Sequence, residues 1–155
     1  MQIRRFKAED TAQVARLFHD TVRRINIQDY SPQQVTAWSP DDLYFRDWHR
    51  VCSTRFTVVA EQKSKIIGFG ELEADGQIDC FYVHCLHQRQ GVGARLYLAI
   101  EQKARDLNLT RLSVAASITA KPFFLSRGFE AIAEQQVSCR GENFTNYLMD
   151  KELNY

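Results

Sequence analysis

The sequence predicts an α/β (α+β) fold, with a central mixed, mostly antiparallel sheet of about seven strands flanked by about four helices. Two observations predict this class. Segments with strand and with helix periodicity both occur along the chain, and the strand-like segments in its middle are joined by short turns. A chain of 155 residues with 45% hydrophobic content can bury one core without metal or disulfide bonds. We therefore expect a single domain over residues 1–155.

The N-terminal part of the chain predicts one strand and three helices. Residues 1–6 alternate in polarity, which favours a strand. Apolar residues then recur at helical spacing, which predicts an amphipathic helix over about residues 10–25. Ser31-Pro32 and Ser39-Pro40 each place a capping hydroxyl before a proline at the first helical position. These pairs predict two short helices.

The middle of the chain predicts three antiparallel strands. Residues 56–60 and 65–70 are rich in β-branched and aromatic side chains, with a polar turn between them. Asp75-Gly76 is the strongest hairpin signal in the chain, and it leads into a third strand over residues 77–83.

The last part of the chain combines helices and strands. An apolar stripe predicts a long helix over about residues 92–107. A buried strand, a short helix closed by a glycine and two final strands complete the prediction: residues 111–115, residues 121–126 with Gly128, residues 130–138 and residues 144–150.

The charge balance excludes partners that bind through bulk electrostatics. Lys and Arg number 20 and Asp and Glu number 19, so the formal net charge is +1. Neither nucleic acid nor a membrane surface is therefore an expected partner. The first residues lack the apolar run of a signal peptide, and the four cysteines show no C-x-x-C pairing. We expect a cytoplasmic protein with free thiols.

The segment from Gln88 to Ala94 predicts an anion site. It joins a strand to the start of a helix, where backbone N–H groups lack intrahelical partners and the helix dipole is positive. Gly91 and Gly93 would let a phosphate group approach these amides. The glycines of a G-x-G-x-x-G turn and the lysine of a P-loop are absent, which disfavours both of those nucleotide-binding folds.

These residues resemble the acetyl-CoA loop of the GNAT N-acetyltransferase superfamily, whose pattern is (Q/R)-x-x-G-x-(G/A). Gln88, Gly91 and Gly93 fill it. Residues 120–129 also resemble the family's short helix with an aromatic pair before Gly-Phe, and the order of elements matches over essentially the whole chain. A looser similarity to a poorly characterised bacterial branch rests on Val22–Asn26, Asp29-Tyr30, Gln33 and Trp38.

The resemblance implies a sheet splayed open between the strand ending at Val83 and the strand ending near Ser117, with the pantetheine arm of acetyl-CoA in the gap. It implies that the Val83 backbone N–H polarises the thioester carbonyl. The residues expected to bind acetyl-CoA as cosubstrate are Phe81, Tyr82, Val83, Gln88, Arg89, Gln90, Gly91, Val92, Gly93, Ala94, Ser117, Ala120 and Phe124.

Two carboxylates are the candidates for activating an attacking amine. Strand alternation puts Asp79 on a face with Phe81 and Val83. The same pattern puts Glu71 on a face with Phe69 and Ile67, so each acid interrupts an apolar face. A solvated strand residue or an ion pair is the alternative interpretation for both.

The proton donor for the leaving thiolate is open. Many family members have a tyrosine where this chain has Phe124, and a phenyl ring cannot give up a proton. Either another group serves or the thiolate leaves into water. The candidate groups are Tyr82, Tyr30, Ser117 and Cys85. We take Asp79, Glu71 and Tyr82 as the candidate catalytic residues.

The expected acceptor is a small amine with an aromatic or apolar body, attacked directly in a ternary complex. Tyr30, Trp38 and Phe45 would line its pocket, although ordinary packing also explains them. The alternatives are a protein or peptide N-acetyltransferase with an open groove and a non-catalytic acetyl-CoA sensor. The crowded motif from His84 to His87 does not favour a metal, and none is expected. The resemblance suggests a monomer or homodimer.

Overall fold

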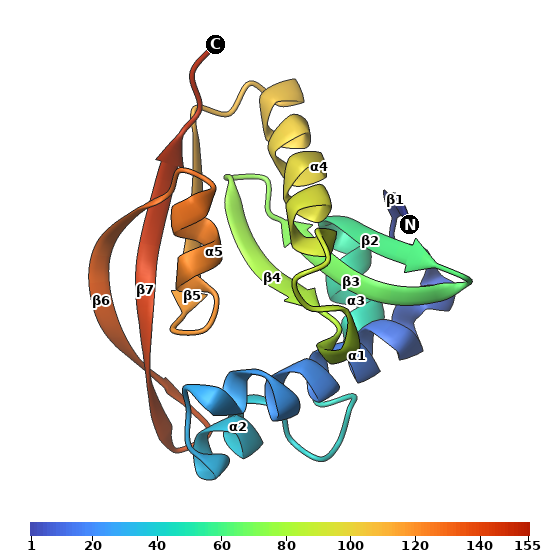
Figure 1. Cartoon of the computed structure of the whole chain (residues 1–155), viewed down its shortest axis with the longest axis vertical. Coiled ribbons are helices and arrows are strands. Elements are labelled where there is room, and N and C mark those ends of the chain that lie inside the picture. Colours follow the sequence, from blue (N-terminus) through green and yellow to red (C-terminus); the bar gives the residue numbers. More distant parts are fainter.

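The strands form one open seven-stranded sheet in the order β1-β2-β3-β4-β5-β7-β6 (Figure 1). The computed structural model describes all residues 1–155. Neighbouring strands are antiparallel except β4 and β5, which are parallel. The strands are β1 (Gln2–Arg5), β2 (Phe56–Gln62), β3 (Lys65–Leu72), β4 (Gln77–Val83), β5 (Arg111–Ser117), β6 (Glu130–Cys139) and β7 (Glu142–Glu152).

Helices cover both faces of this sheet. The α-helices are α1 (Thr11–Arg24), α2 (Pro32–Trp38), α3 (Trp48–Thr54), α4 (Val92–Asp106) and α5 (Lys121–Ser126). Short 3₁₀ turns occupy Ala8–Asp10, Asn26–Gln28 and Cys85–His87. None of the helices combines the length and the apolar composition needed to cross a membrane.

Each face of the sheet has its own core. On one face α4 buries Leu96 and Ile100 against β2 and β3. On the other face α1 and α3 bury Val14 and Trp48. Gly70 allows the close approach of α4, because a Cβ added there would lie 2.8 Å from Ile100 Cδ1. The predicted fold class is confirmed.

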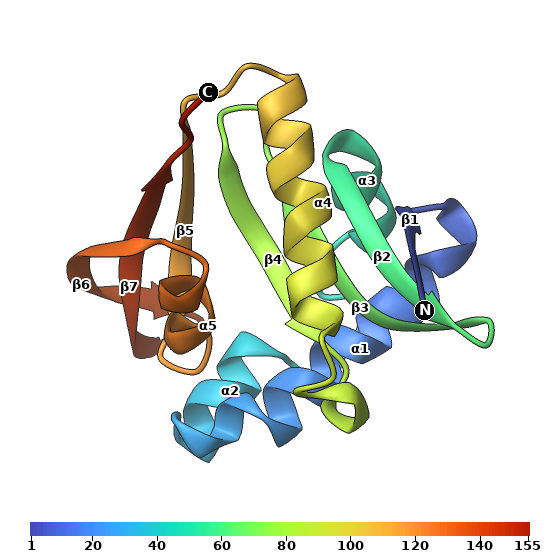
Figure 2. The same ribbon diagram turned by 45° about the horizontal axis from the view of Figure 1, so that its top comes forward.

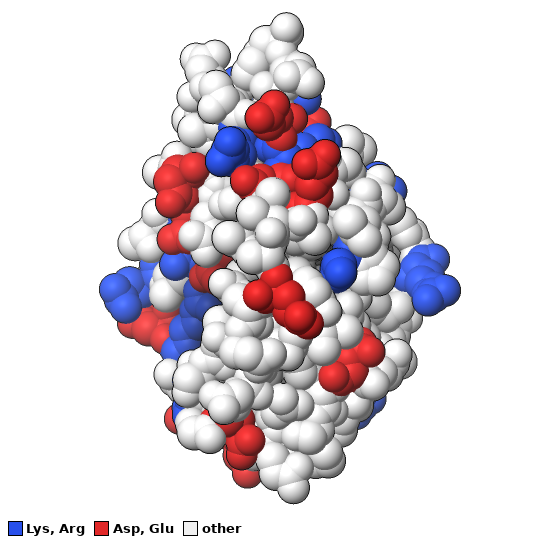
Figure 3. Space-filling model, turned by 90° about the vertical axis from the view of Figure 1, so that its left-hand side faces the viewer, with Lys and Arg blue, Asp and Glu red and all other residues white.

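The charged side chains do not segregate by sign. Lys and Arg lie among Asp and Glu on the face that carries β6 and β7, with apolar and neutral surface between them (Figure 3). No single-sign stripe of the kind that follows a nucleic-acid backbone runs across this face.

The first Ser-Pro pair caps a helix as predicted, and the second does not. The Ser31 hydroxyl accepts a hydrogen bond from Gln34 N at the start of α2. The residues after Ser39-Pro40 form turns and bends, so the helix predicted there is wrong. Ser39 is buried and its hydroxyl bonds His19 Nδ1, which makes it unavailable as a cap. The second short helix, α3, begins later and is capped by Asp47.

The sheet opens at its centre between β4 and β5. These strands pair only at Gln77 with Ser113 and at Ile78 with Val114. Beyond these two pairs they diverge, and Figure 2 shows the unit of β5, β6 and β7 standing apart from β1 to β4. α1 and α2 run across the open end of the gap. The splayed sheet implied by the family resemblance is thus present.

A β-bulge on β4 brings two carboxylates and a thiol together. Residues 70–72 of β3 pair with residues 78–81 of β4, so Glu71 faces both Asp79 and Cys80. The side-chain ligand atoms of these three residues lie within 4.8 Å of one another.

The bulge also corrects the predicted alternation. Asp79 was expected to share a face with Phe81 and Val83, but both of those pack against the α4 core. Asp79 lies instead beside Cys80, which belongs to the core on the opposite face. The prediction is wrong because one extra residue in the strand shifts every later side chain to the other face.

A second irregularity affects the face predicted for Glu71. Phe69 lies in the core on the α1 side, and Glu71 contacts Cys52 of the same core, so these two share a face as expected. Ile67 lies in the α4 core instead. The β2–β3 register shifts near Ala60, and this shift breaks the alternation before Phe69.

Candidate active site

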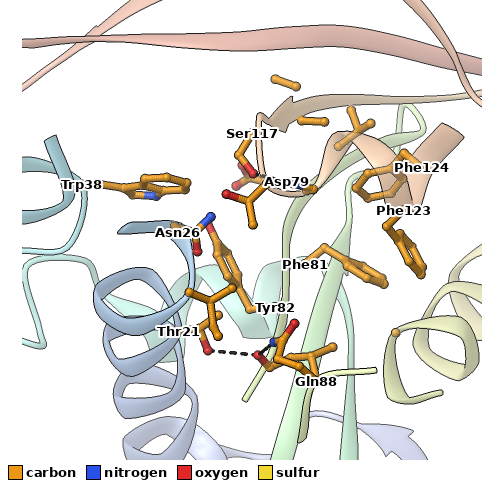
Figure 4. A pocket seen from close by; sticks show the side chains of 18 residues that line it. Thr21, Asn26, Trp38, Asp79, Phe81, Tyr82, Gln88, Ser117, Phe123 and Phe124 are labelled. Carbon is orange, nitrogen blue, oxygen red and sulfur yellow. Dashed lines mark hydrogen bonds between the residues drawn. The ribbon is translucent and has the colours of Figure 1, made fainter. Parts of the chain in front are cut away.

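A cleft of about 190 Å³ lies between β4 and β5, where the sheet opens (Figure 4). The rings of Phe81 and Phe123 stand on one side, and the Trp38 indole stands on the other. Gln88 and Gly93 also line the cleft, so it extends to the loop before α4. The gap in the sheet is therefore an accessible site whose walls are largely hydrophobic, with aromatic rings on both sides.

The loop before α4 presents free backbone amides. Gly91 is the N-cap residue with φ of 82°, a conformation that favours glycine. Arg95 N bonds Gly91 O, which closes the first turn and leaves the N–H groups of residues 92–94 without helical partners. Gly93 lets the Phe123 ring approach, since an added Cβ would lie 3.2 Å from the ring. Both predicted glycines thus have a structural requirement.

The other loop residues divide into exposed and buried groups. Arg89 and Gln90 are exposed, so both side chains can reach a ligand at the mouth of the cleft. Val92 is buried in the α4 core and offers only its backbone. Ala94 is half-buried on the first turn of α4.

The carbonyl of Val83, the last residue of β4, is fixed by two side chains that lie on the side of the gap. Val83 O accepts hydrogen bonds from Gln88 Nε2 at 2.6 Å and from Thr21 Oγ1 at 3.1 Å (Figure 4). A strand residue directs its N–H and C=O to the same side. The Val83 N–H therefore faces the gap, where no partner on β5 pairs with it.

A second pocket, of about 340 Å³, lies on the other side of Asp79. Its apolar wall includes all three residues predicted to bind the acceptor, Tyr30, Trp38 and Phe45. Tyr30 also has a structural role, because its hydroxyl donates to Thr145 O at 2.7 Å and accepts from Ile118 N at 2.9 Å.

The two pockets share one group of lining residues: Trp38, Asp79, Tyr82, Ala115 and Ser117. Among these, Asp79, Tyr82 and Ser117 carry side-chain oxygen atoms, which point toward the same part of the cleft (Figure 4). Ser117 Oγ accepts a hydrogen bond from Ala120 N at 3.0 Å and so also fixes the turn into α5. This junction is where groups held in the two pockets would come into contact.

The two predicted carboxylates occupy different environments. Glu71 is fully buried and lines neither pocket. It accepts from Arg46 at 3.2 Å, from Arg55 at 3.0 Å and from the Cys52 thiol at 3.3 Å. Asp79 pairs with the same two arginines but lines both pockets. Only Asp79 is placed to touch a substrate.

The candidate proton donors are also separated by the structure. Burial raises the pKa of the Tyr82 hydroxyl well above its ordinary value, although the Trp38 indole opposes this shift. Tyr82 therefore stays protonated at neutral pH at the junction of the pockets. The Tyr30 hydroxyl is already engaged, and Phe124 is buried against Phe81 with ring centroids 5.5 Å apart.

Metal-ligand types occur at two places. Glu71, Asp79 and Cys80 lie close together, but the guanidinium groups of Arg46 and Arg55 contact both carboxylates. The second place is the predicted motif at residues 84–87. There His84 Nδ1 accepts from Leu86 N at 3.1 Å and caps the 3₁₀ turn.

Sequence reasoning missed the two arginines and one amide. Arg46 and Arg55 come from the loop before α3 and from its C-terminal end, far in sequence from the carboxylates they neutralise. Asn146 of β7 lines the second pocket opposite Ser117 of β5. The one signal in the sequence was that Glu71 and Asp79 interrupt apolar faces of predicted strands. A buried carboxylate in such a place requires a cation from elsewhere in the chain.

The sequence is similar to known proteins. The family model described as an acetyltransferase (GNAT) domain matches residues 26–151. An Escherichia coli (strain K12) relative, the uncharacterized N-acetyltransferase YafP, is 34% identical over 149 residues, which cover 96% of this chain and 94% of the relative.

Two solved structures are similar as well. A GCN5-related N-acetyltransferase from Rhodopseudomonas palustris, described as aminotransferase, class-II, has a TM-score of 0.92 and 32% identity, covering 98% of this chain and 95% of that chain. The putative acetyltransferase yncA from Salmonella typhimurium, solved with its cofactor acetyl-CoA, has a TM-score of 0.71 and 16% identity, covering 100% and 95%. The latter likeness concerns the fold.

The family model covers most of the chain, and the similarity to the E. coli and R. palustris proteins extends over nearly its full length. The cleft at the open centre of the sheet and the glycine loop at the start of α4 agree with this match. The chain therefore belongs to the GNAT acetyltransferase family, and the predicted enzyme class, an acyltransferase, is confirmed.

Proposed function

We propose that the protein transfers the acetyl group of acetyl-CoA to the amine of a small acceptor with an aromatic body, by direct attack in a ternary complex. The observation that carries this proposal is the junction of the two pockets at Asp79, Tyr82 and Ser117. A thioester entering through the β4–β5 cleft and an amine entering through the aromatic pocket would meet there.

The β4–β5 cleft suits the pantetheine arm and the diphosphate of acetyl-CoA. The amides of residues 92–94 can bind the diphosphate, with the exposed Arg89 and Gln90 at its edge. The unpaired edge of β4 can pair with the extended arm as an added strand would. Ala120 and Phe124 line the same cleft near its thiol end. The acetyl-CoA in the Salmonella structure supports this assignment by fold.

The chain's own groups account for each step of the transfer. The amine nitrogen attacks the thioester carbonyl, and the Val83 N–H binds the oxygen as negative charge develops. Asp79 takes the proton that the amine loses, directly or through a water. The carbon–sulfur bond breaks, the Tyr82 hydroxyl gives its proton to the departing sulfur, and the proton taken up by Asp79 returns to Tyr82 directly or through a water. An aromatic amine is already neutral at pH 7, so only a weak base is needed.

The limited volume of the second pocket favours a small acceptor over a peptide. Tyr30 donates to Thr145 O, and Gln34 Nε2 donates to Asn143 O at 2.7 Å, so α2 is fixed onto β7 along the pocket. A volume of about 340 Å³ is at the lower end of the range for small-molecule sites, roughly 300–1,000 Å³. Four free cysteines suit a reducing compartment, so we retain the cytoplasm as the proposed location, with a single-domain monomer or homodimer as the proposed assembly.

Thiol release from acetyl-CoA tests the proposal directly. A panel of aryl amines, polyamines, amino acids and peptides is assayed with a thiol-reactive dye, and calorimetry measures acetyl-CoA binding. We expect turnover with aryl amines. Binding without turnover of any amine would favour a non-catalytic sensor, and the absence of acetyl-CoA binding would refute the proposal.

Two glycines provide a matched pair of variants for this assay. Gly91 and Gly141 have φ of 82° and 85°, and an added Cβ meets no atom within 4 Å at either position. Gly91→Asp places a negative charge at the proposed diphosphate site and should abolish acetyl-CoA binding. Gly141→Asp introduces the same side chain at a similar backbone conformation in the β6–β7 turn and should leave that binding intact.

A further inference from the structure

We propose that the acceptor carries a carboxylate group and that Arg140, at the rim of the aromatic pocket, binds it. This inference rests on the proposed function, because it identifies the substrate class of the same site. The acceptor would then be an aromatic amine with an acidic group at the end of its ring opposite the amine.

Arg140 is held in a fixed position at the pocket. It occupies the two-residue turn between β6 and β7, where Arg140 and Gly141 have φ of 48° and 85°. Its Nη1 donates to Ala37 O at 2.9 Å, near the C-terminal end of α2. Its guanidinium lies over the Phe45 ring, 4.7 Å from the centroid. One edge of the guanidinium is therefore anchored, while Nε and Nη2 of this exposed residue have no hydrogen-bond partner within the protein.

The charge of Arg140 is not compensated within the protein. The other cation of the pocket, Arg46, is neutralised by Glu71 and Asp79 at 3.2 Å. Arg140 forms no ion pair, and its partners are a backbone carbonyl and the Cys139 thiol. A fixed guanidinium with free N–H groups binds a carboxylate with charge-assisted hydrogen bonds.

Away from Arg140, the pocket is lined by an uncharged polar side chain, the amide of Asn146. Asn146 Oδ1 is buried and has no hydrogen-bond partner, although Asn146 lines the pocket. A buried acceptor of this kind needs an N–H donor. Asn146 is paired in register with Ser117, one of the residues at the junction of the two pockets. An amine placed there would lie beside the Asn146 side chain and Asp79.

The two ends of the pocket thus select the two ends of one molecule. The amine faces Asn146 and Asp79, and the carboxylate faces Arg140. Aromatic side chains, Phe18, Tyr30, Trp38 and Phe144 among them, line the pocket and favour a ring as the connecting body. The opposite orientation would place a carboxylate against Asp79, which like-charge repulsion disfavours.

A pair of isosteric acceptors tests the inference. 4-Aminobenzoate and 4-aminobenzamide share the ring and the amine. They differ in the group that Arg140 would bind, which is a charged carboxylate in the first and a neutral amide in the second. We expect the wild-type protein to acetylate the benzoate with a kcat/KM at least about tenfold higher, the size of one charge-assisted hydrogen bond. Arg140→Gln should lower this ratio about tenfold through KM, and Arg140→Lys should restore part of it.

Arg50→Gln is the matched control. Arg50 is an exposed arginine of α3 that lines neither pocket, so this variant changes the net charge equally and should keep the wild-type ratio. Equal kcat/KM for the two acceptors in the wild type, or an unchanged ratio in Arg140→Gln, would overturn the inference.

A binding measurement separates this inference from the proposed function. Calorimetry with benzoate and benzamide reports recognition without turnover. If no amine is acetylated but benzoate binds more tightly than benzamide and loses that advantage in Arg140→Gln, the anion site stands while the transferase proposal fails. If the two ligands bind the wild type equally, the anion site is refuted whatever the activity.

Discussion

The Gln88 side chain donates a hydrogen bond of 2.6 Å to the carbonyl of Val83, the last residue of β4. This contact joins the loop before α4 to the strand edge that faces the gap. The glutamine of the family pattern therefore has a role in holding the backbone of the site, in addition to any contact with a ligand. Thr21 of α1 supports the same carbonyl from a second direction.

Replacing Gln88 by Ala should impair the chemical step more than folding. Loss of one neutral hydrogen bond costs about 1 kcal/mol, and the freed carbonyl lets the Val83 N–H move from its position. We expect kcat to fall by roughly fivefold to tenfold, as a loss of about 1 to 1.4 kcal/mol implies. Steady-state kinetics with a saturating aryl amine measures this change. Gln102→Ala, on the exposed side of α4, should retain wild-type kcat.

Replacing Tyr82 by Phe should lower kcat while leaving the packing intact. The ring remains between Phe18 and Phe69, with centroids 4.9 and 5.9 Å away, and only the proposed proton donor is lost. A general acid contributes about 10²-fold or more, although a thiolate is a good leaving group, so we expect a loss of roughly 10 to 100-fold. An unchanged kcat would remove Tyr82 from the mechanism. Tyr44→Phe, at an exposed position, is the control.

The pH dependence of Tyr82 gives an independent readout. Burial raises the pKa of this hydroxyl above its ordinary value of 10, so the group keeps its proton as pH rises through 9. Loss of the Tyr82 proton should therefore not lower turnover below about pH 10. Below that pH, the wild type and Tyr82→Phe should show the same alkaline limb in their pH profiles. A decline near pH 8 that disappears in the variant would contradict this assignment.

The two carboxylates of the bulge should respond differently to amide substitution. Glu71→Gln removes the fully buried carboxylate that pairs with Arg46 and Arg55. This loss should lower the unfolding free energy by about 3 kcal/mol. Asp79→Asn removes the proposed base and should mainly reduce kcat. Urea unfolding and steady-state kinetics on both variants separate these effects. A Glu71→Gln protein of wild-type stability, or a fully active Asp79→Asn protein, would contradict the division.

The buried ion pair near the N-terminus should make stability depend on pH in the acid range. Burial alone would raise the pKa of Asp10, but hydrogen bonds from Arg4 and the Lys7 backbone lower it below its ordinary value of 3.8. A lowered folded-state pKa stabilises the protein above about pH 4, and this stabilisation is lost as pH falls through the folded value. Asp10→Asn should cost about 1 to 2 kcal/mol at pH 7 and progressively less below pH 4.

Urea unfolding at several pH values measures the Asp10 effect. Asp41→Asn provides the comparison, because Asp41 also pairs with an arginine but its side chain is 92% exposed. An exposed pair contributes little, so this variant should unfold like the wild type at every pH. A difference between Asp10→Asn and wild type that does not change with pH would show that the carboxylate charge is not the cause.

Local signals in the sequence account for much of the fold. The cap at Ser31, the turn at Asp75-Gly76 and the glycine at position 91 each act through contacts a few residues away. Such interactions depend on residue type and spacing, both of which the sequence displays. The glycine loop before α4 was therefore predicted at the position where the structure has it.

The candidate catalytic centre depends on strand register and tertiary contacts that the sequence does not display. The β4 bulge arises from the register between two strands, so simple alternation misplaced Asp79. The partners of Glu71 come from Arg46, in a segment predicted as helix but formed by turns, and from Arg55 at the end of α3. Long-range pairing of charges follows tertiary packing, and spacing along the chain carries no information about it.

The backbone pairing between the two halves of the sheet is short. One end is fastened by the two residue pairs of β4 and β5, and the other by side-chain bonds from Tyr30 and Gln34 to β7. A ligand in the gap would therefore bridge the unpaired edges of β4 and β5 and contact both halves of the sheet at once. Its binding energy would add to the cohesion of the whole protein, so cosubstrate occupancy and resistance to unfolding should rise together.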